Sequence, residues 1–175
     1  MKTSRQEAFD IAFEHVHRGL TTYLSEAVEL SNGWFFPWIS EDGQVYLGSN
    51  GIIVSKETGE CLELGSAFAV ERDLQFYEAG YTRSAYDIRI SRVHDEALTL
   101  DLLEDLGISV VEPEEAHGVT WKIPRSLSRS ELSARLSELP RAFQNVSVYF
   151  RIEAIERAMA TGCCELQLLP PSNSN

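Results

Sequence analysis

The stretch that decides the fold runs from Gly33 to Ser66 and reads GWFFPWISEDGQVYLGSNGIIVSKETGECLELGS. Its aromatic start is followed by three residue pairs that are typical of tight turns, Asp42-Gly43, Asn50-Gly51 and Thr58-Gly59. Such residues supply the positive φ that hairpin turns require. The stretch therefore predicts an antiparallel β-meander, with strands near 27–30, 34–39, 51–55 and 61–64.

The segments on either side of this meander follow a helical period. Apolar residues at 9, 13, 16 and 20 recur every three or four positions, which predicts an amphipathic helix over residues 4–24. Ser4 and Glu7 have the spacing of a capping box at its start. A second helix is expected over residues 67–80, with Val70, Leu74 and Tyr77 on one side. The N-terminal half is therefore predicted to be a helix, a meander and a helix.

From Tyr86 onwards each segment has its own period. Alternating apolar residues predict strands around 86–90, 108–110, 119–123 and 146–150, and helical spacing predicts helices over 95–106 and 128–139. This order, β-α-β-β-α-β, is that of a ferredoxin-like module, and a further helix at 152–160 and a strand at 165–169 follow it. The sequence thus predicts an α+β protein of two modules, residues 1–82 and 83–175.

The aromatic residues of the deciding stretch have two readings. On a strand, Trp34, Phe36 and Trp38 share one face and Phe35 lies on the other. We expect the Trp face to pack on the first helix, since large aromatic side chains usually contribute to cores. The alternative is that these rings anchor a partner or stack on a sugar.

Charge limits the classes of partner. The chain carries 27 acidic and 15 basic residues, a formal net charge of -12, which disfavours contact with nucleic acid or an anionic membrane and favours a basic partner. From His94 to Trp121 there is no Lys or Arg. We expect the partner-binding residues to include this acidic stretch together with Trp38 or Tyr46 as apolar anchors. The acidic candidates are Asp101, Glu104, Asp105, Glu112, Glu114 and Glu115.

Catalytic and metal-binding patterns are weak. Histidines at 15 and 17 point to different helix faces, and no acidic spacing matches a calcium loop, so no metal or cofactor is expected. Cys163 and Cys164 could meet His94 or His117 in a nucleophilic arrangement, but their local sequence has no nucleophile signature. We expect buried, reduced cysteines and no catalytic residue.

The first ten residues are polar, unlike a secretory signal, and no apolar run is long enough to cross a bilayer. A cytoplasmic location is expected on these grounds. The odd number of cysteines, Cys61, Cys163 and Cys164, is also unlike a disulfide framework.

Residues 5–81 resemble the immunity protein 35 family, also described by its YrhB-like domain. The resemblance rests on the patterns Gly33-Trp34-x-Phe36-x-Trp38, Gly48-x-Asn50-Gly51-x-Ile53-Val54, Thr58-Gly59-Glu60 and Gly65-Ser66. The family comprises immunity proteins of bacterial polymorphic toxin systems, which bind and neutralise a cognate toxin. The resemblance implies a non-enzymatic inhibitor, and the net charge suggests that it occludes a basic active-site cleft. A small Cys-dependent enzyme and a general interaction adaptor are the alternatives.

Overall fold

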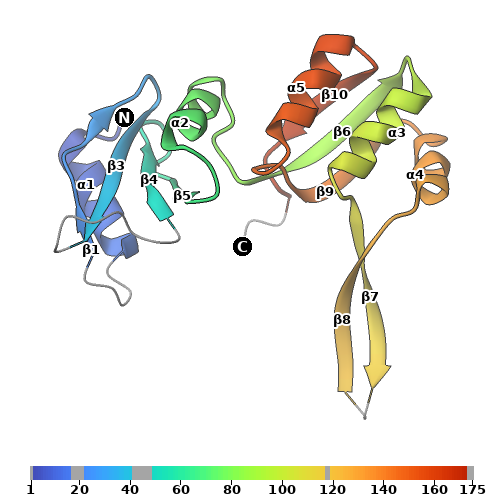
Figure 1. Cartoon of the computed structure of the whole chain (residues 1–175), viewed down its shortest axis with the longest axis horizontal. Coiled ribbons are helices and arrows are strands. Elements are labelled where there is room, and N and C mark those ends of the chain that lie inside the picture. Colours follow the sequence, from blue (N-terminus) through green and yellow to red (C-terminus); the bar gives the residue numbers. More distant parts are fainter. Residues whose placement is uncertain (1, 17–21, 41–48, 117–118, 173–175) are drawn as a thin grey trace. The chain divides into compact units, whose positions relative to one another are not determined.

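The protein is described by a computed structural model in which residues 2–16, 22–40, 49–116 and 119–172 are placed. The chain divides into two compact units, residues 1–82 and residues 83–175 (Figure 1). Both units combine helices with antiparallel strands. The predicted α+β class is therefore confirmed.

The N-terminal unit is built on the predicted meander. Its strands β1 (Thr22–Leu24), β3 (Gly33–Ser40), β4 (Ser49–Ser55) and β5 (Cys61–Gly65) lie in that order in one antiparallel sheet, and β2 (Val28–Glu29) also pairs with β3. Helix α1 (Arg5–Val16) precedes the sheet and helix α2 (Val70–Glu78) follows it.

Helix α1 is shorter than the sequence predicted. Its described part ends at Val16, and residues 22–24, which the apolar period places in the helix, form β1 and pair with Trp38–Ser40 of β3. The β-branched Thr22 and aromatic Tyr23 favour extended backbone, which the apolar period alone did not reveal. The capping box is confirmed, because the Ser4 backbone N–H donates to Glu7 Oε2 (2.8 Å) and the Glu7 N–H donates to Ser4 Oγ (3.3 Å).

The aromatic strand β3 lies between the two helices. Phe36 packs with Ile52 and Val54 against Ala8 and Ala12 of α1, and Trp34 and Trp38 pack on the same cluster. On the opposite face Phe35 packs with Ile53, Leu64 and Tyr77, so that α2 covers this side. The predicted packing of the aromatic face on the first helix is confirmed.

The C-terminal unit follows the predicted β-α-β-β-α-β order. Its elements are β6 (Ala85–Val93), α3 (Glu96–Asp105), β7 (Ser109–Ala116), β8 (Val119–Ser126), α4 (Arg129–Leu136), β9 (Arg141–Ser147), α5 (Ile152–Thr161) and β10 (Cys164–Leu169). Its main sheet has the antiparallel order β10-β6-β9. The core is formed by Ile88 and Ile90 of β6 with Leu103, Leu132 and Ile155 of the three helices.

Strand pairing in this unit departs from a ferredoxin-like sheet. Strands β7 and β8 pair with each other as a separate ribbon, which extends away from the sheet and helices of its unit (Figure 1). The place beside β6 is taken by β10. Pro113 and Pro124 offer a physical reason, because proline lacks the N–H that a central strand must donate.

Candidate protein-docking surface

The β7–β8 ribbon is the most exposed apolar part of the described chain. All eight residues of β8 are exposed, and the exposed fractions of Val111, Val119, Trp121 and Ile123 are 63, 52, 56 and 43%. Single exposed apolar residues are ordinary, whereas several on one element indicate an interaction site. A two-stranded ribbon without cover is also only marginally stable in water. The ribbon therefore has the properties of a surface that a partner covers.

The register assigns each side chain of the ribbon to a face. Trp121 is opposite Glu114, Ile123 opposite Glu112, and Val119 opposite Ala116. Opposed residues share a face, so Val119, Trp121 and Ile123 form an apolar row on β8. We call the side that carries this row the Trp121 face. The other side, the Val111 face, carries Val111, Pro113, Glu115, Thr120, Lys122 and Pro124.

Proline closes both outer edges of the ribbon. The Leu127 N–H donates to the Ile108 carbonyl (2.8 Å), so this pair and every second pair along the ladder are hydrogen-bonded across the ribbon. Pro113 and Pro124 belong to the other pairs of the ladder, in which backbone N–H groups point away from the partner strand. Proline has no N–H, so no donor points outward at these two positions. Each outer edge thus lacks a donor near its middle. A partner is expected to contact a face of the ribbon and not to extend it as a further strand.

Arg125 forms hydrogen bonds at the end of the ribbon that is nearest to helix α4. Arg125 donates through both terminal nitrogens to Glu131 (Nη2 to Oε1, 2.8 Å; Nη1 to Oε2, 3.0 Å) and through Nε and Nη2 to Glu112 Oε1 (3.0 and 2.8 Å). Glu131 also completes the capping box of α4 with Ser128. These hydrogen bonds raise the pKa of Arg125 and lower the pKa values of Glu112 and Glu131. The network links β7, β8 and α4.

The lowered carboxyl pKa values predict an acid-dependent contribution to stability. A depressed folded-state pKa stabilises the fold above the unfolded carboxyl pKa of about 4.3, and this contribution is lost as pH falls through the folded value. We expect Arg125→Gln to lower the free energy of unfolding at pH 7 and to matter progressively less toward pH 3. Urea unfolding of both proteins across this range measures it, with the exposed Arg89→Gln as control. A difference that is independent of pH would contradict the ion-pair explanation.

The predicted acidic residues of α3 are exposed but engaged within the protein. Arg129 Nη1 lies 2.7 Å from Asp101 Oδ1 and also contacts Glu104, and these hydrogen bonds raise the pKa of Arg129. Asp105 Oδ2 lies 3.9 Å from Arg157 Nη1, and the Asp105 carbonyl accepts from Arg151 Nε (2.6 Å). The basic residues that follow the acidic stretch thus fold back onto it.

The remaining predicted residues lie in different places. Glu112 is on the Trp121 face, and Glu115 is exposed on the Val111 face, while the backbone of Glu114 pairs with that of Trp121. The side chain of Glu114 is outside the described part of the structure, as is Tyr46. Trp38 is half-buried in the N-terminal unit and packs on the α1 cluster, which accounts for it as a core residue.

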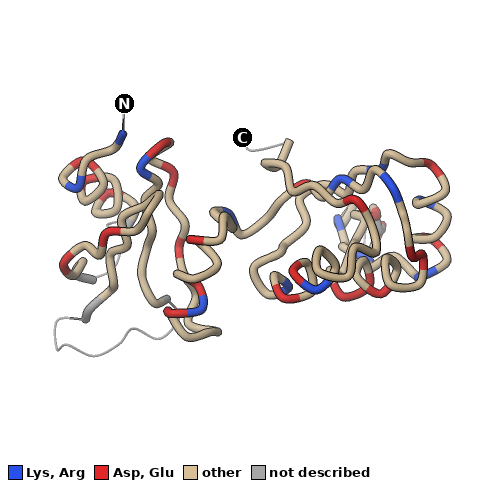
Figure 2. Tube along the Cα trace, turned by 90° about the horizontal axis from the view of Figure 1, so that it is seen from above, with Lys and Arg blue, Asp and Glu red and all other residues tan. Residues whose placement is uncertain are grey.

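Charge is distributed unequally between the units. Residues 1–82 contain 13 acidic and 5 basic residues, a formal charge of -8, whereas residues 83–175 contain 14 and 10, a charge of -4, which together give -12. Figure 2 shows acidic and basic positions interleaved along the C-terminal unit. The residues that sequence reasoning chose for charge therefore belong to the less acidic unit.

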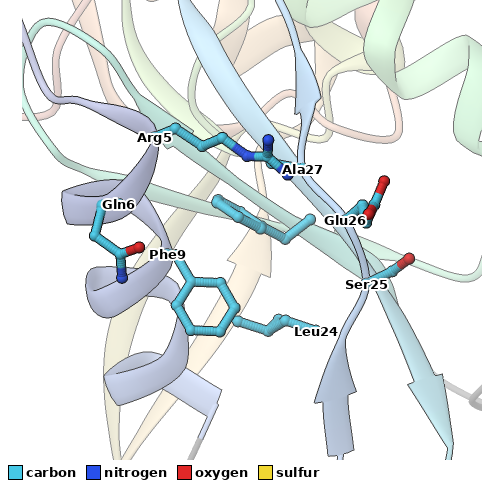
Figure 3. Close-up of a pocket in the computed structure, with 8 residues that line it drawn as sticks. Arg5, Gln6, Phe9, Leu24, Ser25, Glu26 and Ala27 are labelled. Atoms are coloured by element: carbon cyan, nitrogen blue, oxygen red, sulfur yellow. The ribbon is translucent and has the colours of Figure 1, made fainter.

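The N-terminal unit contains a groove of about 510 Å³ between α1 and the segment that joins β1 to β2. Phe9, Leu24 and Ala27 line it, and Arg5 and Glu26 are among its polar residues (Figure 3). Phe9 also packs against the core cluster. The groove is thus continuous with the packing of α1 on the sheet.

The cysteines are poorly placed for nucleophilic chemistry. Cys163 and Cys164 are buried and free, with their sulfur atoms 4.0 Å apart, and burial raises the pKa of the Cys164 thiol to about 12. A nucleophilic cysteine requires a lowered pKa and access to substrate. His94 donates its backbone N–H to the Cys163 carbonyl (2.8 Å), and its Nε2 lies 3.8 Å from Glu165 Oε1. In the described ranges, His, Cys, Asp and Glu do not form a group of three that could hold a metal ion.

Sequence reasoning identified β7 and β8 as strands but missed Val119, Trp121 and Ile123 as surface residues. Their alternation is the same as that of a half-buried strand. The available signal was the presence of a proline in each strand, which is typical of strands with a free edge.

No protein-family model, curated protein or solved structure matches the chain. The resemblance to the immunity protein 35 family therefore stays a prediction. None of the helices in the described part of the chain combines the length and apolarity that a membrane crossing requires.

Proposed function

We propose that this protein acts by binding a cationic protein partner, and that the Trp121 face of the β7–β8 ribbon is the central contact. The observation that carries this proposal is the uncovered apolar row of Val119, Trp121 and Ile123. Tryptophan is enriched among the residues that dominate binding energy, and apolar neighbours exclude water around it. Burial of this face by a partner would therefore contribute much of the binding free energy.

The partner is expected to meet both apolar contact and long-range attraction. The ribbon contains three acidic residues, Glu112, Glu114 and Glu115, and two basic residues, Lys122 and Arg125, so its own charge is small and its contribution is mainly apolar contact. The net charge of -12 produces a long-range field that accelerates encounter with a positively charged protein. The same charge opposes close approach of a second copy of this chain. A cationic protein with an apolar patch is therefore the occupant that fits best.

Within this class we propose the role that the resemblance implies, neutralisation of a cognate bacterial toxin in the cytoplasm. A toxin that acts on nucleic acid or nucleotides needs a basic cleft, and an acidic inhibitor with a projecting ribbon is suited to occlude such a cleft. The buried thiols disfavour the alternative of a Cys-dependent enzyme.

Co-expression with a candidate toxin domain from a neighbouring gene tests the proposal. We expect the wild-type protein to restore survival and to form a stoichiometric complex that is resolved by size-exclusion chromatography with light scattering. Association should slow as salt rises from about 50 to 500 mM, because screening weakens the steering field. Survival that is unchanged by the protein would overturn the proposed role. A salt-independent on-rate would overturn the assignment of a cationic partner.

The same chromatography tests whether a second copy of this chain, and not a toxin, covers the ribbon. If the free protein is a dimer that Trp121→Ala converts to a monomer, then a second copy covers the ribbon and the docking assignment is wrong. A monomeric wild-type protein that associates only with the toxin supports it.

A further inference from the structure

The C-terminal unit contains a cavity whose lining is positively charged, although the chain as a whole is acidic. It has a volume of about 570 Å³ and lies between the segment that joins α3 to β7 and the outer strand β9 of the main sheet. Arg135 and Arg141 both line it. No Asp or Glu is among its lining residues, all of which the structure describes, although the chain contains 27 of them.

Arg141 is the more distinctive of the two arginines. Its Nε is buried and has no hydrogen-bond partner among the described residues, and its side chain as a whole is 35% exposed. Its only close carboxylate in the described structure is that of Glu138, 3.9 Å from Nη1. Buried polar groups are nearly always hydrogen-bonded, so an unsatisfied guanidinium nitrogen beside a cavity indicates a missing acceptor.

Arg135 and the cavity wall complete the site. Arg135 lies in the last turn of α4, where a cation also interacts favourably with the helix dipole. That interaction explains a positive charge at the helix end, but it does not explain a second arginine, Arg141, in the lining of the same cavity. Buried Leu106, Ile108 and Phe143 supply apolar wall, while Ser109, Gln144 and Ser147 supply polar groups.

We propose that this cavity binds a small anionic molecule that carries a phosphate or carboxylate group on a partly apolar body. The guanidinium groups of Arg135 and Arg141 receive the oxyanion, since arginine binds both kinds of group with paired, charge-assisted hydrogen bonds. The apolar wall contacts the rest of the molecule. The volume is in the range of small-molecule sites and larger than a bare phosphate ion needs. The inference does not rest on the proposed toxin partner, and the site shares only Ser109 and Val110, at the start of β7, with the ribbon.

Nuclear magnetic resonance titration of the full chain at 150 mM salt tests the proposal with four probes, namely phenyl phosphate, phenylacetate, inorganic phosphate and benzyl alcohol. We expect saturable shifts of backbone amides at Ser109, Gln144 and Ser147 with the first two probes. Inorganic phosphate should bind more weakly because it leaves the apolar wall uncovered, and uncharged benzyl alcohol should not saturate. The tighter of the two aromatic anions identifies the preferred group.

Variants separate a specific site from general attraction to a positive charge. Arg141→Gln and Arg135→Gln should each weaken binding by about tenfold to a hundredfold, whereas Arg141→Lys should retain part of it. Arg89→Gln, which removes an exposed arginine of β6, should leave affinity unchanged. Thermal unfolding checks the fold of each variant, and Arg135→Gln carries the test if Arg141→Gln does not fold. Absence of saturable shifts with any anion, or equal loss in Arg89→Gln, would overturn the proposal.

Discussion

Replacing Trp121 with alanine is expected to weaken binding of the proposed toxin partner by at least about a hundredfold, which corresponds to loss of roughly 3 kcal/mol from one central aromatic contact. Trp121 is 56% exposed in the free protein, so its loss removes little internal packing. The melting temperature of the free protein should therefore change little. Titration calorimetry with the purified toxin domain measures the affinity, and thermal unfolding measures the fold.

The opposite face of the ribbon provides the matched control. Val111 is even more exposed than Trp121 and lies on the same ribbon, but its side chain points to the Val111 face. Val111→Ala should reduce affinity by less than about threefold, since exposed peripheral contacts contribute little. Trp121→Phe should retain part of the binding. Equal losses in Val111→Ala and Trp121→Ala would show that no single face is used. Unchanged affinity in Trp121→Ala would remove the ribbon from the interface without refuting a binding function.

Gly51→Ala is expected to destabilise the N-terminal unit by about 3 kcal/mol or more. Gly51 has a φ of 149°, a conformation that side-chain-bearing residues rarely adopt. A Cβ atom there would lie 2.5 Å from the Phe36 carbonyl oxygen and 2.6 Å from the Phe35 ring. Both neighbours belong to the central strand β3, so neither can move without disturbing the core. The residue also sits at a register irregularity between β4 and β5.

Gly59→Ala separates steric overlap from backbone strain in the same unit. Gly59 has a φ of 70°, but its nearest contact for an added Cβ is Ile11 at an ordinary 3.5 Å. Its substitution should cost only about 1–2 kcal/mol, the usual cost of the left-handed conformation. Urea unfolding followed by tryptophan fluorescence suits the comparison, since Trp34 and Trp38 lie in this unit. A smaller loss in Gly51→Ala than in Gly59→Ala would contradict the packing around β3.

Local patterns predicted the elements well because turns, caps and periods are local properties. Thr58-Gly59 lies between β4 and β5 as predicted, with a φ of 70° at Gly59. The predicted turn at Asn50-Gly51 is wrong, because both residues belong to β4 and Gly51 pairs with β3 and β5. Asp42-Gly43 lies outside the described residues. The extent of α1 was overestimated because four apolar residues fit a helical period across a segment whose end is extended. Periodicity does not register the preference of Thr22 and Tyr23 for a strand.

Which strands pair with each other could not be predicted from local sequence patterns. Alternation at Val119, Trp121 and Ile123 indicates a strand, but it does not say whether the apolar side meets a core or solvent. The neighbour of β6 proved to be β10, which lies more than sixty residues further along the chain. Such contacts are set by the global arrangement of helices and sheet, which no window of sequence contains.

The acidic stretch illustrates the same limit for electrostatics. Sequence showed that acids precede bases between residues 94 and 141, and this separation suggested a free acidic surface. The fold instead joins Asp101 to Arg129 and Glu112 to Arg125, across separations of 28 and 13 residues. Acidic and basic residues that lie in separate stretches of the sequence are therefore brought into contact by the fold.

The two prolines at the outer edges of the ribbon have a consequence for the protein while it has no partner. A projecting ribbon with an exposed tryptophan would ordinarily be a template on which further strands assemble into fibrils. Pro113 and Pro124 each remove one outward N–H from that template, which disfavours strand addition at both edges while the apolar face stays exposed. A binding protein of the proposed kind exists without its partner for part of its life, and the two prolines limit strand addition to its ribbon during that time.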